Sequence, residues 1–414
     1  MRGLSRAVWI MGALSACLAM GYGVLFTIVA DYRDAYGISE TAIGWLIGVG
    51  FIAGFFAQTF IAPIADRGHA RRVILAGVAI NVLGLLGMAF GETLEVLMAG
   101  RIVSGIGIGA ALPAIRRIVI LTDTENVGEN LGRLLSADVF GFAMGPAVSA
   151  LLVSELDLGL ASPFIVVAAA TVILLPPTMR LAVEETVDPS GQRLAVDLLR
   201  SRVVAGAVVL AAGVFLMIGA FDALWDLVHE DLETPEWMAN LGITLFAVPL
   251  IILGPTGGRL AQRVGPFRVA AVGLVFGAFF IFMYGQLPSG SWIFTFTMFH
   301  AITDALTIAS SGVAVAMAVP EERQAGAQGL IGAAQALTGG ITAGVIGGIY
   351  EGSGRAAAYT TASIAMLVVT VIGMWLAADF WRNRTHEAHA ATGDGGAADA
   401  RPRHQARRPK VRDR

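Results

Sequence analysis

Long apolar stretches separated by short polar segments fill the chain almost from end to end. A bilayer core of about 30 Å requires roughly 20 apolar residues in a helix, so such stretches predict membrane crossings. They lack the apolar–polar alternation of a membrane β-barrel, so the sequence predicts an all-α membrane protein with twelve transmembrane helices. The twelve stretches cover residues 8–30, 42–64, 73–91, 95–115, 133–154, 161–178, 203–225, 238–257, 267–286, 291–318, 326–350 and 357–380.

The composition supports this prediction. Of the 414 residues, 56% are hydrophobic and 14% are charged, whereas soluble domains carry roughly 25% charged residues. Too few polar residues remain to cover a soluble surface, which excludes a cytosolic enzyme, and the high hydrophobicity excludes a disordered chain. The net charge of −3 gives no indication of a nucleic-acid partner.

The basic residues predict the orientation, because loops on the cytoplasmic side of a membrane protein are enriched in Lys and Arg. If the N-terminus is inside, the outer loops hold only Arg33 and Arg355, and the outer segment 226–236 has five acidic residues. We therefore expect a multi-pass protein of the inner cell membrane with both termini in the cytoplasm. The arginines on the cytoplasmic side are then Arg2, Arg6, Arg67, Arg71, Arg72, Arg116, Arg117, Arg133, Arg180, Arg193, Arg200, Arg202, Arg259, Arg263, Arg268 and Arg323.

The longest internal loop divides the twelve stretches into six and six. This predicts an N-terminal six-helix bundle over residues 1–180, a cytoplasmic linker over 181–201 and a C-terminal six-helix bundle over 202–381. Residues 382–414 are rich in Ala, Gly and Arg, which predicts a disordered basic cytoplasmic tail.

Two similar loops occupy matching positions in the two halves. Residues 62–72 read APIADRGHARR, and residues 258–268 read GRLAQRVGPFR. Asp66 and Gln262 are 196 residues apart, about half of the spanning region, which indicates an internal duplication. An acid beside arginines at a helix end can form a charge latch that breaks during gating. The candidate gating residues are Asp66, Arg67, Arg71, Gly258, Arg263 and Gly265.

These loops resemble the signature loop of the major facilitator superfamily, which reads Gly, three residues, Asp-Arg, one residue, Gly and then basic residues. Ala62 and His69 replace the glycines of the first copy, and Gln262 replaces the acid of the second. The resemblance covers about residues 8–380. It implies two pseudo-symmetric six-helix bundles around a central cavity that opens alternately to each side, and neither a cofactor nor a metal.

The fourth stretch contains Arg101. An arginine within a bilayer costs roughly 2.5–3.5 kcal/mol on insertion scales, so it should face a cavity or an acid. The segment resembles the fourth-helix motif of the superfamily, with Ser104 in place of the usual glutamine, which implies a role in proton coupling. The alternative is an arginine near a helix end that reaches the lipid head groups.

The fifth stretch contains Gly132, Gly141 and the pair Gly145-Pro146. This spacing resembles the antiporter motif of the superfamily, although the motif ends in two glycines where this chain has Ser149 and Ala150. The resemblance implies drug/proton exchange. Glycines admit a neighbouring helix, and a proline removes one backbone hydrogen bond.

Candidate proton carriers are acids within the apolar stretches. The first stretch has none between Val8 and Ala30, so we expect Asp138 or the His300–Asp304 pair, four residues apart on one helix face, to carry the proton. The pair could instead join helices by hydrogen bonds. Asp222 and Asp226 are possible cavity acids or markers of a helix end, and Asp31 is a further candidate.

These observations predict a monomeric secondary active transporter that works by alternating access. Its partners would be a small-molecule substrate, protons and the lipid bilayer. The leading hypothesis is proton-driven export of a small amphipathic molecule or drug. The alternatives are a proton-coupled importer or a metabolite or sugar exporter of the same superfamily and, from a different class, a membrane receptor or enzyme.

Overall fold

The protein is built from helices. The computed structural model describes residues 5–38, 40–181 and 194–378, and these residues contain no β-strand. The predicted all-α fold is therefore confirmed. The first half consists of α1 (Arg6–Tyr36), α2 (Glu40–Phe60), α3 (Ala70–Phe90), α4 (Leu94–Thr122), α5 (Val127–Ser149), α6 (Ser162–Ile173) and α7 (Leu175–Met179). The second half consists of α8 (Arg202–Asp231), α9 (Glu236–Val264), α10 (Pro266–Gln286), α11 (Gly290–Thr307), α12 (Ser310–Ala318) and α13 (Gln324–Leu376).

Eleven segments of the described chain are long and apolar enough to cross a membrane, and the last of them holds two of the twelve predicted crossings. This segment, Glu321–Leu376, includes α13, whose backbone breaks at Gly354 with a φ of 80°. Glycine suits this position because it has no side chain to clash at positive φ. The predicted stretches 326–350 and 357–380 thus lie on the two sides of one break.

Several other crossings are interrupted or extended. The tenth predicted stretch is divided between α11 and α12, and the second ends in the 3₁₀ helix η1 (Ala62–Asp66). Pro146 lies inside α5, and from Ala150 the helix continues as the wider π-helix η3 (Ala150–Glu155). The loss of one N–H at a proline accounts for a local change in helix geometry of this kind.

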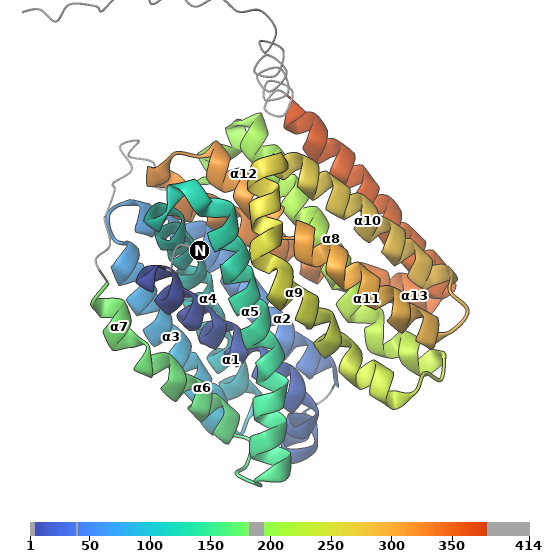
Figure 1. The fold of residues 1–414 in the computed structure, drawn as a ribbon. Coiled ribbons are helices and arrows are strands. Elements are labelled where there is room, and N and C mark those ends of the chain that lie inside the picture. Colours follow the sequence, from blue (N-terminus) through green and yellow to red (C-terminus); the bar gives the residue numbers. More distant parts are fainter. Residues whose placement is uncertain (1–4, 39, 182–193, 379–414) are drawn as a thin grey trace, which may run out of the picture.

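The helices form two bundles that lie side by side (Figure 1). In the first bundle α1 packs against α5, and α4 packs against α2 and α3. In the second bundle α13 packs against α8 and α10, and α9 packs against α11. The helices α5 and α9 meet at the boundary between the bundles. The chain passes from one bundle to the other through residues 182–193, which lie outside the described residues, as does the predicted tail 382–414.

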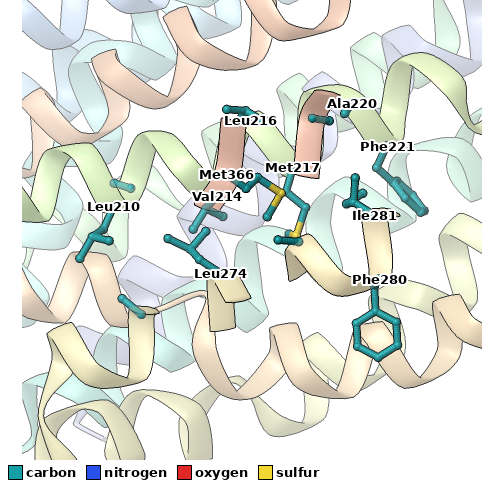
Figure 2. Close-up of a cluster of buried hydrophobic side chains, with 14 of the residues drawn as sticks. Leu210, Val214, Leu216, Met217, Ala220, Phe221, Leu274, Phe280, Ile281 and Met366 are labelled. Carbon is teal, nitrogen blue, oxygen red and sulfur yellow. The ribbon is translucent and has the colours of Figure 1, made fainter. Parts of the chain in front are cut away.

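Figure 2 shows the core of the second bundle, where side chains from α8, α10 and α13 converge. Met217 and Met366 meet beside Gly277, where an added Cβ would lie 2.8 Å from the Met217 sulfur. Flexible methionines fill irregular gaps of this kind. Because lipid is as apolar as these side chains, close packing rather than exclusion from water holds such helices together.

Both described chain ends lie at the same end of the molecule. Val8, near the start of α1, packs in one cluster with Ala65 and Ala325. Near the end of α13, Gly373 and Ala377 contact Gly206 at the start of α8. We call this end, which contains η1, the starts of α5 and α13 and the last turns of α9, the latch end.

Candidate functional site

Asp66 joins the two bundles at the latch end. It ends η1, and its side chain is buried. Its Oδ1 accepts hydrogen bonds from the Arg117 Nε and from the backbone N–H of Ala325, both at 2.9 Å, and its Oδ2 accepts one from the N–H of Gly326 at 2.7 Å. The first N–H groups of a helix have no partner within the helix, and a carboxylate there also interacts favourably with the helix dipole. Asp66 therefore caps α13 of the opposite bundle.

The arginine that pairs with Asp66 was not expected. The sequence pointed to the neighbouring Arg67 and Arg71, but Arg117 of α4 forms the ion pair at 2.9 Å. Arg71 donates a hydrogen bond to the carbonyl oxygen of Leu181. No spacing in the sequence links residues 66 and 117, because their contact depends on how α4 crosses η1.

Gln262 forms the matching contact in the opposite direction. Its Oε1 accepts a hydrogen bond from the N–H of Gly128, and its Nε2 donates one to the carbonyl oxygen of Glu125, both at 2.7 Å. Gln262 of the second bundle thus caps the start of α5 of the first bundle. The sequence treated Gln262 as a departure from the acidic pattern, whereas the structure shows that its neutral amide forms the equivalent cap.

Glycines bring the backbones of α5 and α9 together beside this cap. An added Cβ on Gly128 would lie 2.1 Å from the carbonyl oxygen of Gly258, and one on Gly132 would lie 2.1 Å from that of Gly254. Real Cβ atoms do not approach oxygen so closely, so both positions require glycine for this packing. Of the other candidate gating residues, Gly265 follows the last residue of α9 with a φ of 119°, and Arg263 is exposed.

A third contact at the latch end connects the segment between the bundles to α13. Arg323 donates hydrogen bonds of 2.5 and 2.7 Å to the two carboxylate oxygens of Asp197 in η4 (Val196–Arg200). These hydrogen bonds from Arg323 hold the pKa of Asp197 below its ordinary value. Asp197 therefore takes up a proton at a lower pH than an unpaired aspartate does.

The second half of α5 packs within its own bundle. An added Cβ on Gly141 would lie 2.0 Å from the carbonyl oxygen of Ala16, and one on Gly145 would lie 2.5 Å from the carbonyl carbon of Gly23. The glycines of the antiporter-like segment thus serve two contacts. Gly132 faces α9 of the opposite bundle, and the two later glycines face α1.

Asp138 lies between these two contacts on α5. The Ser15 hydroxyl of α1 donates a hydrogen bond to Asp138, and the Arg116 guanidinium of α4 lies 3.8 Å from it. Three helices of the first bundle therefore meet at this carboxylate.

His300 and Asp304 lie on one face of α11, inside the second bundle, where they are 1% and 3% exposed. The His300 Nε2 is 3.5 Å from the Asp304 Oδ1, and its Nδ1 is 2.9 Å from the Tyr284 hydroxyl. The imidazole also stacks on Phe280 at 4.8 Å. This titratable pair is sealed within the protein in this conformation.

Arg101 lies inside the first bundle and is 1% exposed. Its guanidinium carbon is 3.9 Å from the centre of the Tyr22 ring, so the partner is an aromatic face that the sequence did not suggest. Asp222 of α8 is exposed and lies within electrostatic range of Tyr22. The side chain of Asp226 lies outside what the structure describes, and Asp31 is exposed on α1.

No group of three or more His, Cys, Asp or Glu side chains within the described part of the chain is arranged to hold a metal ion.

Comparisons with known proteins identify the fold. The model of the Major Facilitator Superfamily matches residues 11–229 and again residues 203–412. Multidrug resistance protein 2 of Bacillus subtilis is 22% identical over 312 residues, which cover 71% of this chain and 78% of that protein. The 4-hydroxybenzoate transporter PcaK of Pseudomonas aeruginosa is 31% identical over 176 residues, or 40% of this chain and 37% of that protein. The human organic anion transporter MFSD10 has the same fold, with a TM-score of 0.74 at 15% identity over 89% of this chain and 99% of that one.

Because the family model matches both halves, the chain belongs to the major facilitator superfamily. The protein is accordingly a multi-pass membrane transporter of small molecules and not an enzyme.

We predict that Asp66→Asn destabilises the closed latch end. Loss of a charged hydrogen-bond acceptor costs about 1.5–3 kcal/mol, a roughly ten- to hundredfold shift toward open conformations. Transport should slow, while substrate affinity stays within a few-fold, because the hydrogen-bond partners of Asp66 are protein groups and not the substrate.

Distances between spin labels at Arg72 and Glu321, both exposed, would measure the opening. Asp123→Asn is the matched control, because Asp123 caps η2 (Thr124–Asn126) within one bundle. Equal effects of the two substitutions would count against the latch.

Gln262→Ala should open the same end through the other cap. Each of its two neutral hydrogen bonds contributes about 1 kcal/mol. Since an amide does not titrate in this range, the increase in opening that the substitution causes, measured with the same labels, should be equal at pH 6 and pH 8. Gln286→Ala, at an exposed position of α10, is the control. If the closed population of Gln262→Ala equals that of the unmodified protein, Gln262 does not stabilise the closed latch end.

Gly145→Leu should abolish transport without preventing membrane insertion. Its Cβ would lie 2.5 Å from backbone atoms of Gly23 and Val24, which cannot yield as a flexible side chain would. Transport in vesicles, normalised to the inserted protein, should fall at least tenfold. Phe140→Leu, at an exposed position of the same helix, should transport normally. Unchanged transport by Gly145→Leu would remove the mechanistic role of this contact.

Proposed function

We propose that the protein exports a small amphipathic molecule or drug in exchange for protons. The observation that carries this proposal is the position of the antiporter-like segment. Its Gly132 packs α5 on the opposite bundle, and its Gly145 packs α5 on α1 of its own bundle. Its Asp138 lies between the two contacts and meets Arg116 and Ser15. The relative named multidrug resistance protein 2 also supports export.

The distribution of arginines predicts how the protein is oriented in the membrane. It favours a latch end in the cytoplasm, with both termini on that side of the inner membrane. The closed latch end then corresponds to a conformation that is shut toward the cytoplasm. When the transporter opens inward to load its substrate, three contacts would break: the cap formed by Asp66, the cap formed by Gln262 and the ion pair between Arg323 and Asp197. The working unit in this proposal is a monomer, with the transport pathway between the two bundles of one chain.

The proton would be carried by Asp138 or by the His300–Asp304 pair. Asp138 lies among three helices of one bundle, whereas Asp304 is enclosed in the other. Arg101 cannot carry the proton itself, because a guanidinium keeps its proton in proteins. Its part in coupling is a fixed positive charge beside Tyr22.

A second candidate is proton-coupled uptake, or export of a metabolite. The relative named as a 4-hydroxybenzoate transporter favours this candidate, because its matched region has the higher identity of the two relatives. The two candidates differ in whether the proton and the substrate cross the membrane in opposite directions or in the same direction. Antiport requires that the substrate and the proton weaken each other's binding, and symport requires the reverse.

A vesicle experiment separates the candidates. The purified protein is reconstituted, a panel of amphipathic cations, neutral molecules and carboxylates is added on one side, and lumenal pH is recorded with a trapped dye. Antiport predicts that the substrate and the proton move in opposite directions. Movement in the same direction would establish symport and overturn the export proposal.

Asp138→Asn and Asp304→Asn should each impair proton-driven transport. At least one of them should also remove the pH dependence of substrate binding, measured from pH 6 to pH 8 on the purified variants. In an antiporter the unmodified protein should bind substrate more weakly as the pH falls, because a proton on the carrier disfavours the substrate. If both variants keep the unmodified pH dependence, neither residue is the carrier, and Asp222 or Asp31 would be tested next.

A further inference from the structure

The guanidinium of Arg101 is a buried charge with unused hydrogen-bond donors. The side chain is 1% exposed, and neither its Nε nor its Nη2 has a hydrogen-bond partner among the described residues. Its contact is the face of Tyr22 at 3.9 Å. An aromatic face attracts a cation but leaves the in-plane N–H donors unsatisfied.

Other arginines of the described chain pair with carboxylates, whereas Arg101 does not. Arg117 is equally buried, and its Nε donates to the Asp66 carboxylate at 2.9 Å. Arg116 lies 3.8 Å from Asp138, and Arg323 forms two hydrogen bonds with Asp197. No carboxylate of the described residues lies within ion-pair distance of Arg101. A buried charge without a counter-charge is costly, so it persists where function requires it.

The position of Arg101 connects it to the boundary between the bundles. It lies against the ring of Tyr22 of α1, and Tyr22 is within electrostatic range of Asp222, an exposed residue on α8 of the other bundle. On its other side, an added Cβ on Gly50 of α2 would lie 2.4 Å from the Arg101 Nε. The absence of a side chain at Gly50 therefore makes room for the guanidinium.

We propose that Arg101 is the receptor for an anionic group of the substrate, and that the cargo is an organic carboxylate with an apolar body. A carboxylate accepts two parallel hydrogen bonds from a guanidinium and so supplies the missing partners of Nε and Nη2. Tyr22 covers the charge in this conformation, and its ring meets Phe51 edge to face at 5.1 Å. Displacement of Tyr22 would expose the donors beside an aromatic wall that suits an apolar body.

This inference rests on the proposed transport function and narrows its substrate. It also has an electrical consequence. Exchange of one outgoing monoanion for one incoming proton moves two charges in the same sense, so an inside-negative membrane potential drives export. Exchange of a monocation for a proton moves no net charge, and neither does symport of a monoanion with one proton.

Binding is tested with matched probes on the full-length purified protein. The probes are benzoate, phenylacetate and octanoate, each compared with its neutral amide and its protonated amine. At least one carboxylate should bind ten or more times more tightly than its amide. Arg101→Gln should remove this preference and leave amide binding within about threefold. Arg101→Lys should keep part of it, because an ammonium provides charge without the paired donors.

Two further variants guard against a merely structural effect. Gly50→Ala keeps the charge but places a methyl group against the guanidinium, so it should weaken carboxylate binding and leave amide binding unchanged. Arg180→Gln removes an exposed arginine at the end of α7 and should change neither. The inference is overturned if no carboxylate is preferred over its amide, or if the preference survives in Arg101→Gln.

A transport measurement keeps this inference separate from the export proposal. Vesicles are clamped with potassium and valinomycin, and movement of the preferred carboxylate is followed with and without a potential. Acceleration by an inside-negative potential supports both proposals. Electroneutral movement together with protons would leave the anion site intact and overturn export. Proton-driven exchange of amines that is unaffected by Arg101→Gln would support export and overturn the anion site.

Discussion

The contact between the two bundles at the latch end depends on how unpaired backbone groups at the starts of two helices are satisfied. The first N–H groups of a helix have no partner within it, and inside a protein they must find one elsewhere. The start of α13 obtains its acceptor from Asp66 of the other bundle, and the start of α5 obtains its acceptor from Gln262. Each bundle therefore supplies the cap that the other lacks. If the latch end opens as proposed, water must replace both caps, so these contacts would contribute directly to the free-energy difference between the conformations.

The caps can form only because the backbones are close. In a bilayer, small residues allow the close helix packing that apolar side chains alone do not drive. Gly128 and Gly132 provide it between the bundles, and Gly141 and Gly145 provide it within the first bundle. The same helix thus contacts the opposite bundle on one side and its own bundle on the other, and in the proposed mechanism the contact with the opposite bundle separates. This arrangement suits rigid bundles that move about a seam between α5 and α9.

The sequence predicted the crossings well, because apolar length is a local property that each stretch carries by itself. The repeated loop also drew attention to Asp66, whose side chain contacts the opposite bundle. It could not supply the partner Arg117, because that contact depends on the crossing of α4 and η1. Gln262 was read as a missing acid, yet its amide accepts from an N–H and donates to a carbonyl. A carboxylate at that position could not do both.

The arrangement on α4 indicates how a proton within the first bundle could affect the latch end. Arg116 and Arg117 are adjacent, and successive residues of a helix point in different directions. Arg117 pairs with Asp66 in the latch, and Arg116 faces the candidate proton carrier Asp138. A proton on Asp138 would remove the negative charge that faces Arg116, one residue from the arginine that holds Asp66. Coupling requires an element with two arrangements that both sites influence. The Asp66–Arg117 contact would be such an element if it forms and breaks during transport. Because Arg116 and Arg117 are adjacent on α4, a change at Asp138 could reach this contact through them.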